Sequence, residues 1–152
     1  MGLKTTQFLA LVLTALALVP AGAHLLALPN KIDLSEADYF TVQGIYRGWA
    51  PLGIVLCAAI LADLALAIRL RRRRAAFWYA LFAFIAMLAS LAIFFLWTFP
   101  ANQVTVNWTV VPDDWRTLRA QWEYSHAVNA ALAFLAFCAV VLSALLARDD
   151  AA

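Results

Sequence analysis

Residues 64–84 read LALAIRLRRRRAAFWYALFAF, two apolar runs that meet at a cluster of five arginines, Arg69 and Arg71–Arg74. Each run extends to the roughly 20 residues that a helix needs to cross the hydrocarbon core of a bilayer. A backbone in lipid has to satisfy its own hydrogen bonds, and no alternating β-barrel pattern is visible. This stretch therefore predicts two transmembrane helices that form a hairpin at the arginines.

Long apolar runs separated by short polar segments continue through all 152 residues. Hydrophobic residues make up 66% of the chain and charged residues 13%, whereas a soluble domain carries about 25% charged residues. The pattern predicts one integral membrane domain, 1–152, and leaves no room for a soluble module. We expect an all-α, up-down bundle of four transmembrane helices at about 5–28, 49–70, 75–99 and 114–147.

The first apolar run has a second interpretation, as a secretory signal peptide. Lys4, the apolar stretch after it and Ala21-Gly22-Ala23 resemble the charged start, the apolar centre and the cleavage site of such a signal. However, the apolar stretch continues past that site to Leu28. We therefore expect the run to be retained as a helix.

The basic residues predict the orientation of the bundle. Seven of the eleven lie at one end, namely the arginine cluster, Lys4 and Arg148, whereas the other end holds six of the nine acids. Basic loops stay in the cytoplasm, so both termini and the arginine turn are expected there. The longer loops, 29–48 and 100–112, then face the periplasm of a bacterial inner membrane. This role accounts for the arginines, and no nucleic-acid partner is expected.

The two longer loops carry signals of local structure. The segment Ser35–Phe40 predicts a short interfacial helix, and Val104–Val106 predicts a short extended stretch. Asp113, which follows a proline, is expected to cap the fourth helix. Four aromatic residues near the first loop are expected to anchor it at the membrane interface: Tyr39, Phe40, Tyr46 and Trp49.

Both histidines of the chain, His24 and His126, map to the end of the bundle away from the termini. Strongly polar residues at membrane depth usually face the bundle interior. Glu123 lies three residues before His126 and therefore projects from the same helix face. Two imidazoles and one carboxylate are the minimum set for a facial-triad iron site or an open zinc site. We predict His24, Glu123 and His126 as ligands of a divalent transition metal (iron, zinc or copper), or as a base.

These residues also have a purely structural interpretation. Glu123 could pair with Arg119 or Arg116, and the histidines could bond to carbonyl groups. A stripe on the fourth helix could line a pocket for a planar substrate, and its members are Trp115, Arg119, Trp122, His126 and Asn129. Trp115 alone fits the interfacial belt better.

Other chemistry-bearing residues are few. Asp63 lies within the second predicted helix, and we expect it to reach Arg69 or the cytoplasmic surface. Cys57 and Cys138 stand alone in apolar runs and are expected to be small buried hydrophobic residues. Without a CxxC motif they argue against a thiol–disulfide oxidoreductase.

Three sequence patterns resemble the anthrone oxygenase-like family of small four-helix membrane proteins. They are Gly22-x-His24, Pro100-x-Asn102 and the block Trp115-Arg116-x-Leu118-Arg119-x-x-Trp122-Glu123-x-x-His126. Some fungal members of that family oxidise anthrones to anthraquinones with molecular oxygen. The resemblance implies an oxygenase activity with Asn102, Arg119, Trp122, Glu123, His126 and His24 as candidate site residues.

We therefore expect a membrane-embedded oxidoreductase acting on a phenolic or polycyclic hydrophobic molecule. In this hypothesis His126 and Glu123 act as base or ligand, and Arg119 stabilises a phenolate. Asn102, Trp115 and Trp122 contact the substrate ring. Two alternatives are a subunit that packs through alanine-rich faces against a larger complex or a second copy, and a bundle that binds haem through both histidines.

Overall fold

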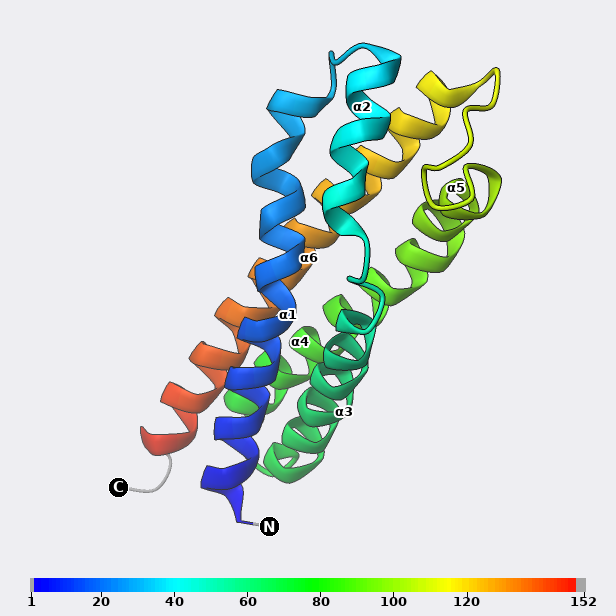
Figure 1. Cartoon of the computed structure of the whole chain (residues 1–152). Helices are drawn as coiled ribbons and strands as arrows, with labels where there is room; N and C mark the ends of the chain where they lie inside the picture. The colour runs from blue at the N-terminus through cyan, green and yellow to red at the C-terminus, as the bar shows by residue number, and fades with distance from the viewer. Residues whose placement is uncertain (1, 150–152) are drawn as a thin grey trace.

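The computed structural model describes residues 2–149, with side chains described through Ala147. This part of the chain contains helices and no β-strand. Four helical stretches are long and apolar enough to cross a membrane, and they run alternately up and down (Figure 1). They are α1 (Leu3–Lys31), α3 (Leu52–Leu70), α4 (Arg74–Ile93) with its continuation to Val104, and α6 (Trp115–Asp149). The predicted all-α bundle of an integral membrane protein is confirmed.

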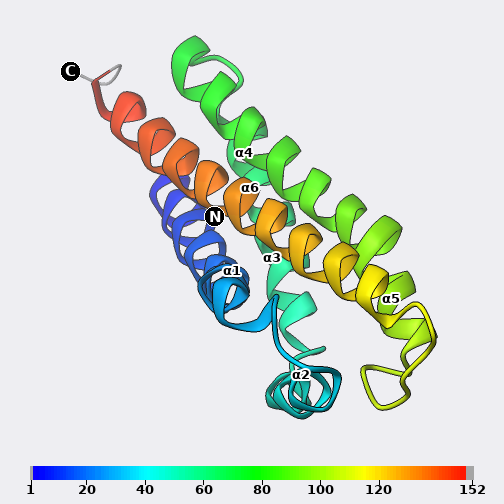
Figure 2. The same cartoon turned by 90° about the horizontal axis from the view of Figure 1, so that it is seen from above.

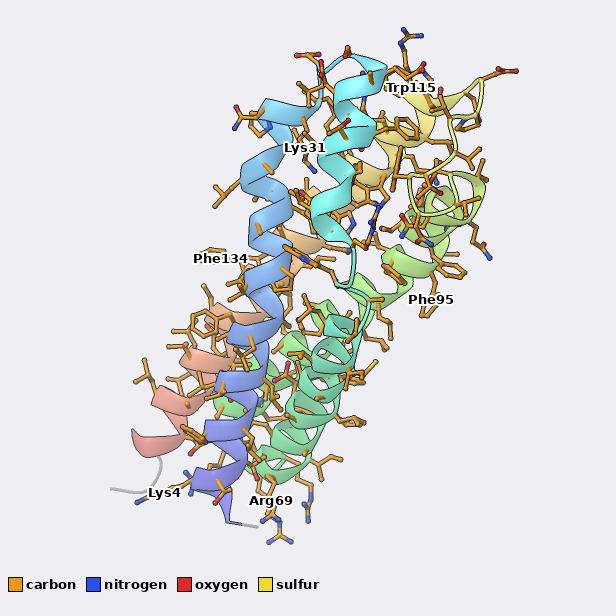
Figure 3. The ribbon with its side chains drawn as sticks, viewed as in Figure 1. Lys4, Lys31, Arg69, Phe95, Trp115 and Phe134 are labelled. Atoms are coloured by element: carbon orange, nitrogen blue, oxygen red, sulfur yellow. The ribbon has the colours of Figure 1, made fainter. Side chains whose placement is uncertain are left out.

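The four helices form a closed ring in which α1 packs on α3, α3 on α4, α4 on α6, and α6 on α1 (Figure 2). The start of α1 and the end of α6 lie at one end of the bundle, together with Lys4 and Arg69 (Figures 1 and 3). Lys31 and Trp115 mark the opposite end, called the distal end below (Figure 3). The side chain of Arg148, used above to predict orientation, lies outside the described part. The assignment of the termini to the cytoplasm stays a prediction.

Alanines fill the contacts between the helices in the half of the bundle near the termini. Small side chains let helix backbones approach closely where lipid gives no hydrophobic driving force. Large apolar side chains such as Phe95 and Phe134 point away from the bundle, each 56% exposed (Figure 3). The alanine-rich faces therefore pack largely against other helices of the same chain. The buried alanines include Ala10, Ala17, Ala59, Ala76, Ala80, Ala83, Ala86, Ala133, Ala136 and Ala139. Cys57, expected to be buried, is exposed on the outer surface.

Asp63 does not reach Arg69 or the surface as expected. Its side chain is fully buried between α3 and α1. The Thr14 hydroxyl donates to both of its carboxyl oxygens, at 3.2 and 3.3 Å. A buried polar group is tolerated where another buried group bonds to it, so this pair ties α1 to α3 inside the bundle.

The third span is longer than predicted because it passes through Pro100. A proline inside a regular α-helix removes a donor and clashes with the preceding turn. Here the preceding residues form η2 (Phe94–Thr98), a π-helical segment in which the Phe99 N–H donates to the Phe94 carbonyl. The wider turn makes room for the proline, and α5 (Phe99–Val104) follows. Gln121 of α6 donates to the Trp97 carbonyl at 2.7 Å and satisfies a backbone group near this turn.

The chain after α5 is not extended as predicted for Val104–Val106. Val106, Asn107 and Trp108 have φ values of 50, 55 and 64°, the left-handed region that a β-branched valine rarely adopts. The Asn107 N–H donates to the Asn102 carbonyl at 2.7 Å, and the Trp108 N–H donates to Thr105 Oγ1 at 3.0 Å. These bonds hold a tight turn that directs the Trp108 side chain into the bundle, where it is 6% exposed.

The first loop forms the predicted short helix, α2 (Glu36–Gln43), and then the single turn η1 (Gly44–Tyr46). Ser35 caps α2 because its hydroxyl accepts from the Asp38 N–H at 3.3 Å. Tyr39 was expected at the membrane interface, but it is completely buried. Helix α2 therefore covers the distal end with a side chain that enters the core. Helix α6 begins at Trp115, so Asp114 occupies the position before it that Asp113 was expected to hold.

The orientation can be tested by cysteine labelling after replacement of the two native cysteines. Glu36→Cys at the distal end and Arg72→Cys in the arginine turn both place the thiol at an exposed position. A membrane-impermeant maleimide should label Glu36→Cys in intact cells and Arg72→Cys only after the membrane is opened. The reverse pattern would contradict the predicted orientation.

The polar tie between α1 and α3 predicts a loss of stability in Thr14→Val. This nearly isosteric change removes the hydroxyl donor from a fully buried carboxyl group, which should lower the free energy of unfolding by about 1–3 kcal/mol. Thermal unfolding in detergent measures the change. Thr5→Val alters an exposed threonine of the same helix and should be close to neutral.

Candidate functional site

The two histidines meet at the interface between α1 and α6. Their rings are stacked, with centroids 3.9 Å apart and planes 20° from parallel. His24 is 7% exposed, whereas His126 keeps partial exposure. The predicted convergence of these two side chains is therefore present, and it places two imidazoles in direct contact at the level of the distal half of the bundle.

Aromatic rings surround the histidine pair. Trp122 lies one turn before His126 on α6, and its ring is 5.0 Å from the His24 ring and 4.2 Å from the His126 ring. Tyr46 of η1 packs against His24 at 4.2 Å, and Trp49 approaches it edge-on at 5.5 Å. The pair is thus walled by three large rings, two of which come from the segment that follows α2.

Glu123 does not point at the histidines. Its Oε1 atom forms an ion pair with Lys31 Nζ at 2.9 Å, and the two side chains are 0% and 3% exposed. Neither Arg119 nor Arg116, the partners considered from sequence, takes this role. Removing one member of a buried ion pair leaves an unpaired charge and typically costs about 3–5 kcal/mol. The Lys31–Glu123 pair therefore ties the end of α1 to α6.

Two tyrosines form further hydrogen bonds to this ion pair. Lys31 Nζ donates to the Tyr46 hydroxyl at 2.8 Å, and the Tyr39 hydroxyl donates to Glu123 Oε1 at 3.0 Å. Gln43 donates in turn to the Tyr39 hydroxyl oxygen. Burial and the neighbouring Glu123 carboxylate raise the pKa of Tyr39 well above its ordinary value. The Tyr39 hydroxyl therefore keeps its proton and remains a donor to Glu123.

Asn102 organises the tryptophans at the distal end. Its side-chain oxygen accepts from the indole N–H of Trp122 at 2.8 Å and from that of Trp108 at 3.1 Å. The left-handed turn described above brings Trp108 into this position. Asn102 thus fixes the Trp122 ring, which contacts both histidines, and does not itself contact them in any described interaction.

Arg119 and Trp115 lie farther out in the same aromatic layer. Arg119 donates to the Leu34 carbonyl at 2.8 Å, and its guanidinium lies 4.8 Å from the Trp115 ring centroid and 5.4 Å from that of Tyr39. Trp115 is 4% exposed, so it belongs to the core and not to an interfacial belt. Arg119 therefore holds α2 against α6. The buried cation that lies against the rings around the histidines is not Arg119 but Lys31, through its Nζ atom.

Several buried polar atoms at this level have no hydrogen-bond partner among the described residues. They include His24 Nδ1, Glu123 Oε2 and Asn129 Oδ1. No group of three or more His, Cys, Asp or Glu side chains within the described residues converges as a metal site would. Of the predicted triad, the two imidazoles are adjacent, whereas the Glu123 carboxylate is held in the ion pair with Lys31.

The histidine geometry does not suit a haem. Two axial imidazoles approach the iron from opposite faces of the porphyrin. The rings of His24 and His126 are in face-to-face contact at 3.9 Å, which leaves no space for an iron and its macrocycle between them.

An apolar groove of about 270 Å³ lies on the bundle surface between α1 and the start of α3. Trp49 forms part of its wall, and the same ring contacts His24. The Trp49 ring therefore lies between the groove and the histidine pair. Its other lining residues are Leu16, Val19, Pro20, Leu52 and Val55.

Comparison with known proteins returns no match to a family model, a curated protein or a solved structure.

Lys31, Tyr39, Tyr46 and Trp108 belong to the site although the sequence interpretation did not select them. Lys31 is one of the four basic residues at the end with the longer loops, and no role followed from its position there. A usable signal was present, since Lys31 lies seven residues, two helical turns, after His24 and so shares its helix face. The tyrosines and Trp108 reach the site through tertiary folding of the loops, which helical periodicity does not report.

The role of Asn102 predicts that Asn102→Ala disorders the tryptophan layer. Two indole N–H groups lose their acceptor, so the free energy of unfolding should fall by about 1–3 kcal/mol and the tryptophan emission should shift to longer wavelength. Asn30→Ala changes an exposed asparagine at the end of α1 and serves as the matched control. Equal stability and emission in both variants would contradict the role assigned to Asn102.

Proposed function

We propose that this protein is a membrane-embedded oxidoreductase that oxidises a planar, hydrophobic phenolic or polycyclic substrate at the distal end of the bundle. The observation that carries the proposal is the stacked pair of His24 and His126 inside a wall of aromatic rings. His24 Nδ1 is buried without a partner among the described residues, so a ring nitrogen is free to accept a proton from a bound molecule.

The surroundings of the histidines favour an apolar aromatic substrate. Trp122, Tyr46 and Trp49 offer ring faces and edges, which attract other aromatic rings at centroid separations of about 4.5–7 Å. A molecule dissolved in the bilayer can reach Trp49 through the groove between α1 and α3 without passing through water. The site therefore suits a substrate that partitions into lipid.

An anthrone-like carbon acid illustrates the chemistry. A histidine removes a proton from the activated ring CH₂ group, and the resulting enolate transfers electrons to molecular oxygen. The hydroperoxide formed at that carbon loses water and leaves a carbonyl group. One CH₂ group and one O₂ thus become one C=O group and one H₂O. The protein contributes a base, a dry aromatic enclosure and stabilisation of the enolate charge.

A metal-assisted version of this reaction uses the same two side chains. His24 and His126 would supply two nitrogen ligands, and the buried, unpartnered Asn129 Oδ1 lies on the same face of α6 as His126. In this version the metal would supply oxygen activation. Glu123 would stay with Lys31.

His126→Gln tests the proposal. Loss of the imidazole should lower the rate of anthrone oxidation by about 10²–10⁴-fold, the usual contribution of a positioned general base. Oxygen uptake and quinone absorbance, measured together in detergent, give the rate and the expected one-to-one stoichiometry. Tyr124→Phe lies on the exposed side of α6 and should keep the wild-type rate.

Wild-type protein that oxidises anthrone no faster than empty micelles would overturn the proposal, as would a folded His126→Gln variant with full activity. Metal content in the same two preparations separates the two versions of the mechanism. A stoichiometric metal that is lost in His126→Gln supports metal assistance, and activity in metal-free wild-type protein supports the base alone.

A further inference from the structure

We propose that Lys31 and Tyr46 form the binding site for the oxygen of the substrate and hold its negative charge after deprotonation. This inference rests on the proposed function and names the substrate class more closely, as a planar phenol or enolisable ketone. The two groups lie 2.8 Å apart, from Nζ to the hydroxyl oxygen, and both are donors. Two adjacent donors of this kind are the arrangement that stabilises a developing oxyanion.

Each of the two groups has a hydrogen left to donate. An ammonium group carries three N–H donors, and Lys31 uses one for Glu123 and one for Tyr46. The Tyr46 hydroxyl accepts from Lys31, and within the described residues its own proton has no acceptor. A substrate oxygen placed beside both groups can therefore receive two hydrogen bonds without displacing either existing bond.

The position of these donors relative to the histidines fits the chemistry. The Tyr46 ring packs on His24 at 4.2 Å between centroids, and Lys31 Nζ lies 4.9 Å from the Trp122 ring centroid. An oxygen held at Lys31 and Tyr46 thus belongs to a molecule whose ring lies beside Trp122 and the histidine pair. A histidine then acts as the base for the acidic carbon, and the Lys31 cation stabilises the negative charge that develops on the oxygen.

Glu123 acts as a positioning residue in this arrangement. The Tyr39 hydroxyl fixes Glu123 Oε1 at 3.0 Å, and the same oxygen holds Lys31 at 2.9 Å. Lys31 is therefore kept at the level of Tyr46 and not extended toward water. Arg119, assigned to charge stabilisation from the sequence, is instead occupied by the Leu34 carbonyl and by the rings of Trp115 and Tyr39.

The test uses a hydroxylated anthraquinone dye, whose phenolate absorbs at longer wavelength than the phenol. Binding is followed by tryptophan quenching, and ionisation of the bound dye by its visible spectrum as the pH is changed. A lysine ammonium next to the oxygen should make the bound dye ionise about 1–3 pH units lower than in empty micelles. Tyr46→Phe should lose part of this shift.

A double variant keeps the test valid if a lone buried charge prevents folding. Lys31→Gln combined with Glu123→Gln removes both members of the ion pair and should abolish the shift. Lys4→Gln, an exposed lysine at the other end of α1, should leave the shift unchanged.

The outcomes separate the two proposals. A dye that binds but ionises as in empty micelles, or an equal shift in the double variant, overturns the oxyanion site and leaves the oxidoreductase proposal standing. A shift that depends on Lys31 in a protein that does not oxidise anthrone supports the oxyanion site and contradicts the oxidoreductase. Absence of any binding to the wild-type protein overturns both.

Discussion

The buried ion pair between Lys31 and Glu123 determines the arrangement of the distal end. A charged pair without exposure to water is stable only when further hydrogen bonds satisfy it, and Tyr39 and Tyr46 supply them. These two tyrosines come from α2 and η1, so the requirement of the ion pair also fixes the loop that covers the bundle. The same pair draws the carboxylate of Glu123 away from the histidines and leaves two imidazoles alone within an aromatic wall.

The two halves of the bundle meet different physical demands. Near the termini, alanines allow close backbone contact, and the carboxyl group of Asp63, which is fully buried there, is bonded to Thr14. At the distal end, large rings and polar side chains replace the alanines, since α5, α2 and the start of α6 form a separate cluster around Tyr39, Trp108 and Trp115. The π-helical turn before Pro100 lets the third span extend far enough to bring Asn102 into that cluster. The alanine-packed half near the termini thus supports a chemically varied distal end.

The sequence alone predicts the parts that depend on segment length and local spacing. Four spans follow from the length of the apolar runs, and the meeting of His24 with His126 follows from their similar depth. The partner of Glu123 could not be found in this way, because helical spacing offered Arg119 and the true partner, Lys31, comes from another helix. The burial of Trp115 was also missed, because it depends on contacts with other elements and not on spacing within α6. The chain direction after α5 depends on three consecutive left-handed residues, of which only Asn107 has a local preference for that region, so the predicted extended stretch was wrong.

Charge balance links the histidine pair to the ion pair. In the proposed reaction, the histidine that accepts a proton starts as a neutral imidazole, and the Lys31–Glu123 pair beside it carries no net charge. If a neutral phenol or ketone enters and gives its proton to a histidine, an imidazolium and an enolate form side by side, and the total charge of the site stays zero. A low-dielectric enclosure tolerates such a separated pair only when the anion has donors close at hand. In the proposed site Lys31 and Tyr46 supply those donors, whereas Lys31 without Glu123 would carry an uncompensated charge when no substrate is bound. In the proposed reaction, the ion pair that holds the distal end together would also supply the compensated cation that a charged intermediate inside a membrane protein needs.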